Sequence, residues 1–385
     1  MKIALVCDWY APRLGGIEVQ LEALARRLTR AGHQIQIITT TPGPSAPGVV
    51  RLSVPLLAGV GVMYTGRGFA ALDEALAGGG FDVVHSHISI VSPAAIGAGF
   101  LANRLGIPLV VTFHSWIPGM RALTRTIGGA LGSRHWIALF TAVSARVARE
   151  VAPCAPGEHI ELLPNGVDST KWGQSPLISA AKTTGEFQEG QSRLIASKPF
   201  EIVSVMRLNA KKRPGALLSV MAELKRTLPA RMNVRLRVAG DGPERARLER
   251  AIAKRGLDDC VELLGRRSHD EIRALYGECD AFVLPTVRES FGIAAAEARC
   301  AGLPIVARGG SGVDDWIEHE RDGLLASTDA GLADALVRLL TDDALRTRIA
   351  RHNRATTPSV DWAPVLERHL ELYARAIALR RSVSA

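Results

Sequence analysis

The feature that most constrains the fold is a regular alternation of short apolar runs with helical repeats. Lys2–Cys7 has the composition of a buried strand, and Gln34–Thr39 has that of the next one. Between them, apolar residues recur at helical spacing from Ile17 to Leu28, and Gly32 is placed to end the helix. A strand, a helix and a second strand in succession form a βαβ unit, which predicts a parallel sheet.

The alternation occurs in two series along the chain. Between them, residues 173–199 are rich in Gly, Ser, Gln, Lys and Thr and have little periodicity, as expected of a connector or an extended surface loop. The further strand-like runs are 83–85, 109–113 and 138–143 in the first series, and 201–206, 234–239, 261–264, 281–284 and 304–306 in the second.

These two series predict an α/β protein with two Rossmann-like, doubly wound parallel-sheet domains. A chain of 385 residues is also too long for one ordinary core. We expect an N-terminal domain over residues 1–185 and a C-terminal domain over 200–358. The spacing of residues 365–379 predicts a final helix, and whether residues 360–385 return to the first domain stays open.

Composition excludes several classes of protein. A hydrophobic content of 47% with 22% charged residues is typical of a soluble globular protein. The net charge of +9 is spread over both halves of the chain, which excludes a basic arm for nucleic acid and allows anionic substrates, an anionic membrane surface or no partner. The five cysteines form no Cys-x-x-Cys pair, which favours a reducing compartment over disulfides or a zinc site.

Two carboxylates flank a small, apolar stretch after a strand of the second series. Glu289 is expected in the loop, and Glu297 inside the helix that Gly292 opens. Ligands of open α/β sheets bind at the carboxyl ends of the strands, so this stretch is a candidate site. Backbone N–H groups around Phe291 and Ile293 would be free to hold an anion. The helix dipole alone also explains a Glu near a helix start.

Cationic and glycine-rich turns follow the first strand of each series. Arg207 and Lys212 precede a helix that Pro214 is placed to begin, and both could reach one diphosphate. A solvated basic loop explains them equally well. Gly15 and Gly16 allow a close approach of the backbone to an anion, although a simple tight turn is the alternative.

Three histidines lie at the ends of two strands in the first series. His85 and His87 share one face of a strand, but no nearby carboxylate completes a set of metal ligands, so we predict no metal site. His114, at the end of the following strand, is the better candidate for substrate contact.

Taken together, these stretches resemble the family-4 glycosyltransferases, which are retaining enzymes of the GT-B fold with two Rossmann-like domains facing across a cleft. The match runs in order along nearly the whole chain and is most specific in Glu289–Glu297 with Arg207 and Lys212. The other matching stretches are Gly15–Glu18, the strand end at His114, Thr141–Ser144, Asn165–Asp168 and Gly240–Pro243.

The resemblance implies a role for each matching residue. Arg207 and Lys212 would hold the donor diphosphate, and Gly16 would let a loop of the first domain approach the β-phosphate. Glu289 would bind sugar hydroxyls, and His114 would help to position the sugar near the acceptor. The remaining donor contacts would come from Ser290, Phe291, Gly292 and Ile293 at the sugar and phosphate, Glu297 at the ribose and Arg266 at the base.

The implied chemistry needs positive charge where a leaving group departs. When a nucleoside diphosphate leaves, charge grows on its β-phosphate, and preorganised cations and helix N-terminal amides stabilise that charge. Such a clamp can replace a metal, and the sequence has no Asp-x-Asp motif. We therefore expect a nucleoside diphosphate sugar as substrate, with neither a metal nor a cofactor. A front-face route, in which the leaving phosphate takes the acceptor's proton, is the usual expectation for this family.

The N-terminal portion resembles the subgroup that acts on inositol lipids and related acceptors, such as phosphatidylinositol mannosyltransferases. This likeness implies GDP-mannose as the first choice of donor and a UDP-sugar as the second, with a lipid, inositol or glycan hydroxyl as acceptor. Residues 120–136 place Arg121 and Arg125 beside Leu123 and Ile127, a pattern that suits docking on an anionic membrane as well as it suits core packing. We expect a cytoplasmic protein, with peripheral attachment to the inner face of a membrane left open and no prediction of oligomeric state.

Four other readings remain to be weighed. An NAD-dependent dehydrogenase needs a third glycine where Arg245 stands, so Gly240–Pro243 favours a tight turn. A glycosidase would need carboxylates on opposite sides of a sugar, which Glu289 and Glu297 across a helix start do not provide. A UDP-sugar epimerase of GT-B fold and a non-catalytic sugar-nucleotide-binding protein stay as alternatives. The chain differs from the family after its glycine-rich turn at 309–312, where the family commonly has an acidic residue in the pattern Gly-x-x-Glu. Asp315 is the candidate substitute for that residue.

Overall fold

The computed structural model describes residues 1–13, 15–57, 60–61, 66–116, 119, 121–173, 199–229 and 232–384. The chain divides into two compact units, Met1–Gly166 with Ala363–Ala385, and Val167–Trp362. The connector expected at 173–199 lies, apart from its two ends, outside the described residues.

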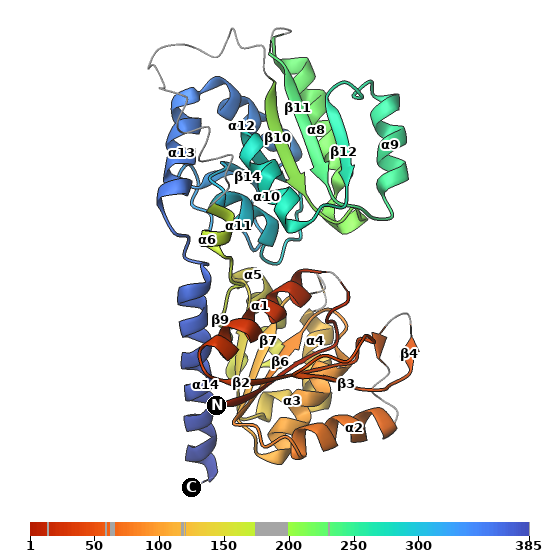
Figure 1. The fold of residues 1–385 in the computed structure, drawn as a ribbon, viewed down its shortest axis with the longest axis vertical. Coiled ribbons are helices and arrows are strands. Elements are labelled where there is room, and N and C mark those ends of the chain that lie inside the picture. Colours follow the sequence, from red (N-terminus) through yellow and green to blue (C-terminus); the bar gives the residue numbers. More distant parts are fainter. Residues whose placement is uncertain are drawn as a thin grey trace. The chain divides into compact units, whose positions relative to one another are not determined.

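The first unit contains a seven-stranded parallel sheet in the order β3-β2-β1-β6-β7-β8-β9, with α1 on one side and α2 and α3 on the other (Figure 1). Its central strand β1 is buried from Ile3 to Cys7, because a parallel strand covered on both faces reads as a continuous apolar run. The strands are β1 (Lys2–Cys7), β2 (Gln34–Thr39), β3 (Val49–Arg51), β6 (Val83–Ile88), β7 (Leu109–Phe113), β8 (Ala138–Ala142) and β9 (Glu161–Leu162). The helices are α1 (Gly16–Arg30), α2 (Gly66–Ala77), α3 (Pro93–Leu105), α4 (Arg121–Leu131), α5 (Ala145–Val151) and α14 (Trp362–Ser384). Short 3-10 turns lie at η1 (Ser133–His135), η2 (Ala152–Cys154) and η3 (Pro156–Glu158). A small hairpin is formed by β4 (Leu56–Leu57) and β5 (Val60–Gly61).

The second unit contains a six-stranded parallel sheet in the order β12-β11-β10-β13-β14-β15. Its strands are β10 (Phe200–Val205), β11 (Val234–Ala239), β12 (Val261–Gly265), β13 (Ala281–Leu284), β14 (Ile305–Arg308) and β15 (Gly323–Ala326). Its helices are α6 (Ser169–Gly173), α8 (Pro214–Thr227), α9 (Arg245–Lys254), α10 (His269–Glu278), α11 (Ile293–Cys300), α12 (Asp329–Thr341) and α13 (Asp343–Ala355), with a 3-10 turn at η5 (Ala210–Lys212).

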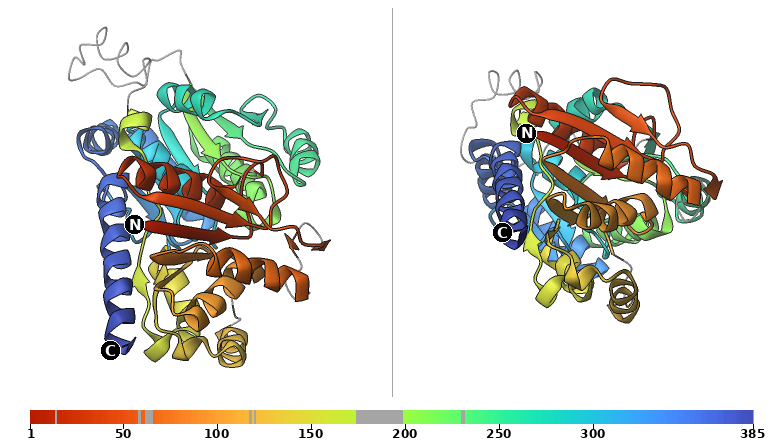
Figure 2. Two further views of the ribbon diagram at one scale, coloured as in Figure 1. Left: turned by 60° about the horizontal axis from the view of Figure 1, so that its bottom comes forward. Right: turned by 90° about the horizontal axis from the view of Figure 1, so that it is seen from below.

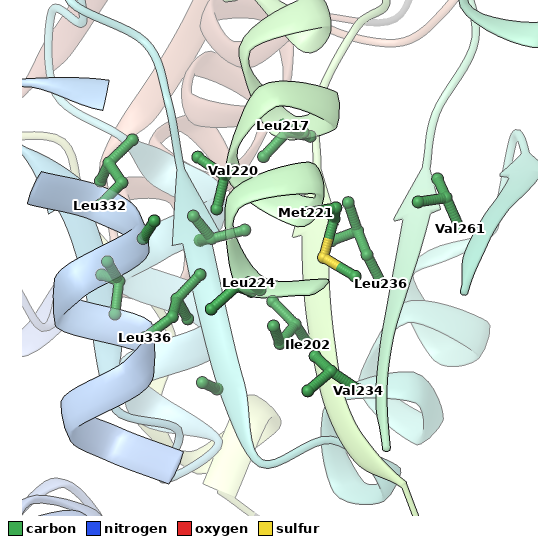
Figure 3. Packing of buried hydrophobic residues seen from close by; sticks show 14 of the residues in the cluster. Ile202, Leu217, Val220, Met221, Leu224, Val234, Leu236, Val261, Leu332 and Leu336 are labelled. Carbon is green, nitrogen blue, oxygen red and sulfur yellow. The ribbon is translucent and has the colours of Figure 1, made fainter. Parts of the chain in front are cut away.

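The core of the second unit lies between this sheet and the helices α8 and α12 (Figure 3). Helix α8 buries Leu217, Met221 and Leu224, the residues whose spacing predicted the helix. Ile202 of β10 and Leu236 of β11 belong to the same cluster. Full burial of one such side chain stabilises the fold by about 1.5–3 kcal/mol, so this packing fixes where β10 ends and α8 begins.

Helix α14 belongs to the first unit from Ala363 onward and runs beside β9 (Figures 1 and 2). Arg375 donates two hydrogen bonds to the Glu161 carboxylate of β9, at 2.9 and 2.7 Å, and Arg368 donates a third at 3.2 Å. Residues 360–385, whose return to the first domain was left open, therefore join it almost completely.

The boundary between the units differs from the one expected at residue 185. Residues after Gly166 belong to the second unit because the short helix α6 packs on α11. The buried ring of Trp172 lies 5.7 Å from that of Tyr276, which anchors this segment. The second unit likewise extends to Trp362 instead of ending at residue 358.

Each sheet has a point where the strand order reverses. In the first sheet this point lies at β1 and β6, and in the second it lies at β10 and β13. Ligands of doubly wound sheets bind at the carboxyl ends of the strands at such points. The predicted site residues should therefore lie in the loops that follow these strands.

Candidate active site

The loops after β10 and β13 bring two predicted site residues together in the second unit. Lys212 Nζ and Glu289 Oε2 are 2.6 Å apart, although the residues are separated by 77 positions. The Glu289 side chain is almost buried, with 9% of its surface exposed, whereas 29% of the Lys212 side chain is exposed. The ammonium group is thus fixed at the switch point with part of its surface open to a ligand.

The turn that carries Lys212 is held on both sides. The Asn209 side chain accepts a hydrogen bond from the Lys212 backbone N–H at 3.0 Å, which closes η5. Arg213 follows with a left-handed backbone, φ 55°, which is unfavourable for a residue with a side chain. Its guanidinium donates to both carboxylate oxygens of Asp329, at 3.0 and 2.6 Å. This paired contact holds the sharp bend, after which Pro214 begins α8.

Arg207 is presented by a close backbone contact between two loops. A Cβ at Gly240 would lie 1.8 Å from the Met206 carbonyl oxygen, and one at Gly242 would lie 2.3 Å from that of Leu208. The two glycines therefore make a tight turn against the loop after β10, as the sequence favoured. Within the described part of the chain, the exposed Arg207 has no hydrogen bond or ion pair, so its guanidinium is available to an anion.

The loop after Glu289 leads into α11 through a glycine in the left-handed region. Gly292 has φ 86° and ψ 51°, and a Cβ there would lie 2.7 Å from Val313, so glycine is required. The Trp316 indole donates to the Phe291 carbonyl at 2.9 Å and fixes the loop from behind. Among the described residues, the N–H groups of Phe291, Gly292 and Ile293 have no protein acceptor, as predicted. Ser290 beside them is partly exposed.

Glu297 lies in α11, partly buried, about one turn beyond its start. Burial raises the pKa of its carboxyl to about 8, and the charge of Lys171 opposes this rise. The Tyr276 hydroxyl lies in the same region and donates to the Ala294 carbonyl at 3.1 Å. A carboxyl held in this way can accept hydrogen bonds from a ligand once it is ionised.

The second unit also contains Arg266 and Asp315, the two other residues that the family resemblance singled out. Arg266 is exposed after β12, which lies two strands away from β10 at the edge of the sheet, and in the described part of the chain it has no hydrogen bond or ion pair. Asp315 is exposed, beyond the Gly312 amide that donates to the Glu289 carbonyl at 2.9 Å. The structure assigns neither a ligand contact.

In the first unit, Gly16 is the exposed first residue of α1, directly after β1 and its turn. A Cβ on the preceding Gly15 would lie 2.4 Å from a carboxylate oxygen of Glu18, so the acidic side chain folds back over the turn. Arg13 pairs with that carboxylate at 3.4 Å. The close approach of Glu18 thus explains the glycine at position 15 without any ligand.

The buried His85 is saturated by protein partners. His85 Nε2 lies 2.6 Å from the Thr112 hydroxyl, which lies 2.6 Å from the Thr141 hydroxyl. His85 Nδ1 lies 2.9 Å from the Tyr373 hydroxyl of α14, so both ring nitrogens have a hydrogen-bond partner. Burial lowers the pKa of His85 well below its usual value. This ring has no nitrogen left for a metal or a substrate.

His87 and His114 form a second pair. Their rings are joined by a hydrogen bond of 3.0 Å between His87 Nδ1 and His114 Nε2. Burial lowers the pKa of His114 to about 3 and that of His87 well below its usual value, so both rings are neutral. His114 therefore lies where the sequence placed it, at the end of β7. In the described part of the chain, no three His, Cys, Asp or Glu side chains form a metal-binding group.

The sequence missed several residues that shape these loops. Asp8 follows β1 directly, and its buried carboxylate accepts hydrogen bonds from Ala94 and Ala95 at the start of α3, at 2.9 and 3.1 Å. Burial raises the pKa of Asp8 to about 6. The position of Asp8 directly after a strand could have indicated it as a residue of interest. No local sequence pattern indicates the pairing of Arg213 with Asp329.

The amphipathic segment predicted in the first unit is helix α4. Leu123 and Ile127 are exposed, so they do not pack in a core. Arg121 and Arg125 each pair with Glu158 at 3.2 Å, which reduces the positive charge of this surface. Within the described chain, no helix is long and apolar enough to span a membrane.

Two family models match successive parts of the chain. Residues 14–171 match the model described as Glycosyltransferase Family 4, and residues 186–356 match the model described as Glycosyl transferases group 1. Between them they cover the second sheet and all strands of the first sheet except β1.

Relatives and solved structures align over nearly the full length. The chain is 27% identical to a glycogen synthase of Mycobacterium tuberculosis, over 98% of this chain and 95% of the relative. It is 26% identical to a phosphatidyl-myo-inositol mannosyltransferase of Mycobacterium leprae, over 97% and 96%, and 25% identical to a D-inositol 3-phosphate glycosyltransferase of Salinispora tropica, over 96% and 82%. Anabaena HepE, solved with UDP and glucose, has the same fold, with a TM-score of 0.75 at 21% identity over 97% of this chain and 99% of HepE. The chain is therefore a glycosyltransferase, a member of the group 1 and family 4 glycosyltransferases with the GT-B fold of two Rossmann-like domains.

Proposed function

We propose that this enzyme moves a sugar from a nucleoside diphosphate sugar to a hydroxyl acceptor, with retention of the anomeric configuration and without a metal. The observation that carries the proposal is the Lys212–Glu289 ion pair at the switch point of the second sheet. Arg207 on the same loop as Lys212, and the N–H groups at the start of α11, have no protein partner among the described residues. Together they offer two cations and several N–H donors to a diphosphate, and one carboxylate to sugar hydroxyls.

Donor binding would rearrange the ion pair. The diphosphate would take the Lys212 ammonium, and Glu289 would then be free to accept hydrogen bonds from the sugar. The bond between the sugar C1 and the β-phosphate oxygen breaks as an acceptor hydroxyl attacks C1 from the same face. The hydroxyl proton passes to the departing phosphate oxygen. Preorganised cations favour this step because they meet charge that grows only as the phosphate leaves.

Nothing in this arrangement requires a bound metal, since the cations of Arg207 and Lys212 face the phosphate themselves. We therefore expect turnover to persist in excess EDTA. Loss of activity in EDTA that returns when Mg²⁺ or Mn²⁺ is added would contradict this part of the proposal.

For donor and acceptor, the names of two relatives support an inositol-containing acceptor. One is a phosphatidyl-myo-inositol mannosyltransferase and the other a D-inositol 3-phosphate glycosyltransferase. GDP-mannose is the first donor to test and UDP-sugars are the second, because HepE was solved with UDP. Glu297 would accept hydrogen bonds from the ribose hydroxyls of either nucleotide.

Docking on an anionic membrane stays a separate proposal. The exposed Leu123 and Ile127 of α4 would insert, and Arg121 and Arg125 would contact lipid phosphates. Because both arginines share Glu158, we expect weak, salt-sensitive binding. Liposome flotation at low salt tests it, and absence of binding to anionic vesicles would contradict it.

A thermal-shift panel of GDP, UDP, ADP and their sugars tests the donor site directly. A ligand present at 100 times its Kd stabilises the folded state by about 2.7 kcal/mol. We expect one nucleoside diphosphate to raise Tm clearly and Arg207→Ala to reduce that shift. No shift with any of these nucleotides would contradict the proposed function.

A further inference from the structure

The ring of His114 is hydrogen-bonded to a second histidine, His87. His87 Nδ1 and His114 Nε2 are 3.0 Å apart, and their ring centroids are 5.3 Å apart. His87 itself is 3% exposed and stacks on His85 with ring centroids 3.9 Å apart. Since His85 is locked between Thr112 and Tyr373, the stack behind His87 cannot shift easily.

The bond between the two neutral rings has a direction. One ring must donate and the other accept, so one of the two remaining nitrogens carries a proton and the other a lone pair. Neither His87 Nε2 nor His114 Nδ1 has a protein partner of normal hydrogen-bond geometry in the described part of the chain.

Two arrangements satisfy this bond. Either His87 Nδ1–H donates to His114 Nε2, and both rings are protonated on Nδ1, or His114 Nε2–H donates to His87 Nδ1, and both rings are protonated on Nε2. In each case the two rings share one tautomer, so the orientation of His87 and the tautomer of His114 are linked.

We propose that His87 is a positioning residue for sugar transfer, which acts through its ring–ring hydrogen bond to hold His114 in one orientation and one tautomer. The proposal rests on the proposed function, in which His114 lies beside the transferred sugar. A ring that turns or changes tautomer would present a donor where the sugar needs an acceptor, or the reverse. A misplacement of about 1 Å near the reacting groups is enough to slow a reaction about 100-fold.

Two substitutions separate positioning from folding. In His87→Asn, the amide group lies near the place of Nδ1 and can still donate to His114, whereas His87→Leu fills the space without a donor. We expect His87→Leu to lower kcat about 10- to 100-fold with little change in the KM for the donor, and His87→Asn to recover most of that loss. His369→Leu is the matched control, because His369 is buried in the same cluster but, among the described residues, hydrogen-bonds only to the Val365 carbonyl of its own helix, at 2.7 Å. Its kcat should stay near that of the wild type.

The tautomers provide a readout that needs no turnover. Long-range ¹H–¹⁵N spectra of the imidazole nitrogens, assigned through single variants, should show His87 and His114 in one shared tautomer in the wild type, both protonated on Nδ1 or both on Nε2. His114 should keep that tautomer in His87→Asn and lose it in His87→Leu. If the wild type turns over no donor, the proposed function fails, while these spectra still test the pair.

Three results would overturn the inference. One is a wild type in which His87 and His114 carry their protons on different ring nitrogens. Another is a kcat for His87→Leu equal to that of the wild type. The third is an equal loss of kcat in the Asn and Leu variants at unchanged Tm, because the ring–ring bond would then not be what His87 supplies.

Discussion

Lys212 and Glu289 hold each other in place in the absence of a donor, so their removal should have different effects. Lys212→Ala removes a cation from the diphosphate, and a hydrogen bond to a charged group is worth about 1.5–3 kcal/mol, which corresponds to roughly 10- to 100-fold in nucleotide Kd. Glu289→Gln frees the ammonium and should spare nucleoside diphosphate binding while it lowers kcat. Titration calorimetry with the nucleotide and initial rates measure the two effects.

Lys211 is the control for this prediction because it is the exposed neighbour on the same turn. Lys211→Ala changes the net charge equally but removes no contact with Glu289. A similar loss of nucleotide affinity in Lys211→Ala and Lys212→Ala would mean that only the general positive potential of the loop matters.

Glu297 should make stability depend on pH in a direction opposite to that of a salt-bridged carboxylate. Its pKa is raised from 4.5 to about 8 by burial, so the folded state holds a proton that the unfolded state releases. The stability contributed by the neutral carboxyl is complete below pH 4.5 and is lost as pH rises through about 8. The difference in Tm between Glu297→Gln and wild type should therefore grow in favour of the variant from pH 5 to pH 8.

Nucleotide binding should favour the ionised form of Glu297, which burial disfavours in the free protein. Ribose hydroxyls donate to an ionised carboxyl, so binding should release a proton at pH 7, which calorimetry in buffers of different ionisation enthalpy detects. Glu297→Gln should abolish this proton release. Release that persists in the variant would place the titrating group elsewhere.

At the scale of elements, the contact between the loops after β10 and β11 should be intolerant of any side chain. Gly240→Ala would drive a Cβ into the Met206 carbonyl, so the loop that presents Arg207 must move. Gly256→Ala is the matched control, since Gly256 also has a positive φ, 60°, but has nothing within 4 Å of the added carbon. We expect the control to lose about 1–2 kcal/mol and Gly240→Ala at least twice as much in urea unfolding.

Equal losses of stability in the two variants would contradict this view of the glycine pair. If the view is right, Gly240→Ala should also weaken nucleotide binding, because the backbone that carries Arg207 is displaced. Gly256→Ala should leave nucleotide binding unchanged.

Helix α14 depends on one carboxylate for its attachment to β9. Glu161, with 13% of its side chain exposed, receives hydrogen bonds from both Arg368 and Arg375. Glu371 pairs with the same arginines from an exposed position on the helix itself. We expect Glu161→Ala to speed amide hydrogen exchange in α14, whereas Glu371→Ala should change it little, since exposed pairs contribute about 0–1 kcal/mol. Equal protection in both variants would show that apolar packing alone holds the helix.

The alternation of strand-like runs with helical repeats predicted the elements well, most clearly where a strand is a buried apolar run, as in β1 and β13. β1, β2, β7, β11 and β13 have the expected bounds. β9 and β15 were missed because they are short edge strands of two and four residues, without a run that stands out. The strand β6 extends to Ile88 beyond the expected end, so that His87 lies within it and beside His85.

The positions of the candidate residues at strand ends were predictable, but the contacts around them were not. Chain position at strand ends indicated Arg207, Lys212, Glu289 and His114, because parallel strands gather their carboxyl ends at one edge. The contacts join distant segments: Lys212 lies 77 positions from Glu289, and its neighbour Arg213 lies 116 from Asp329. No local pattern reports such pairs, since they arise only when the sheets are formed.

At the scale of the whole molecule, the two units carry separate parts of the proposed reaction. The second unit has the cations, the open amides and the carboxylates that a nucleoside diphosphate sugar needs. The first unit has the paired histidines. The proposed transfer needs an acceptor, whereas an epimerase would change the donor alone.

The most direct test follows the anomeric carbon by NMR, with the donor identified by the thermal-shift panel and with inositol, inositol phosphate and phosphatidylinositol as acceptors. We predict that nucleoside diphosphate appears only when an acceptor is present and that the new glycosidic bond keeps the anomeric configuration of the donor. The same reaction should fail in Glu289→Ala. A product of inverted configuration, or a donor sugar that is altered without any acceptor, would contradict the proposal.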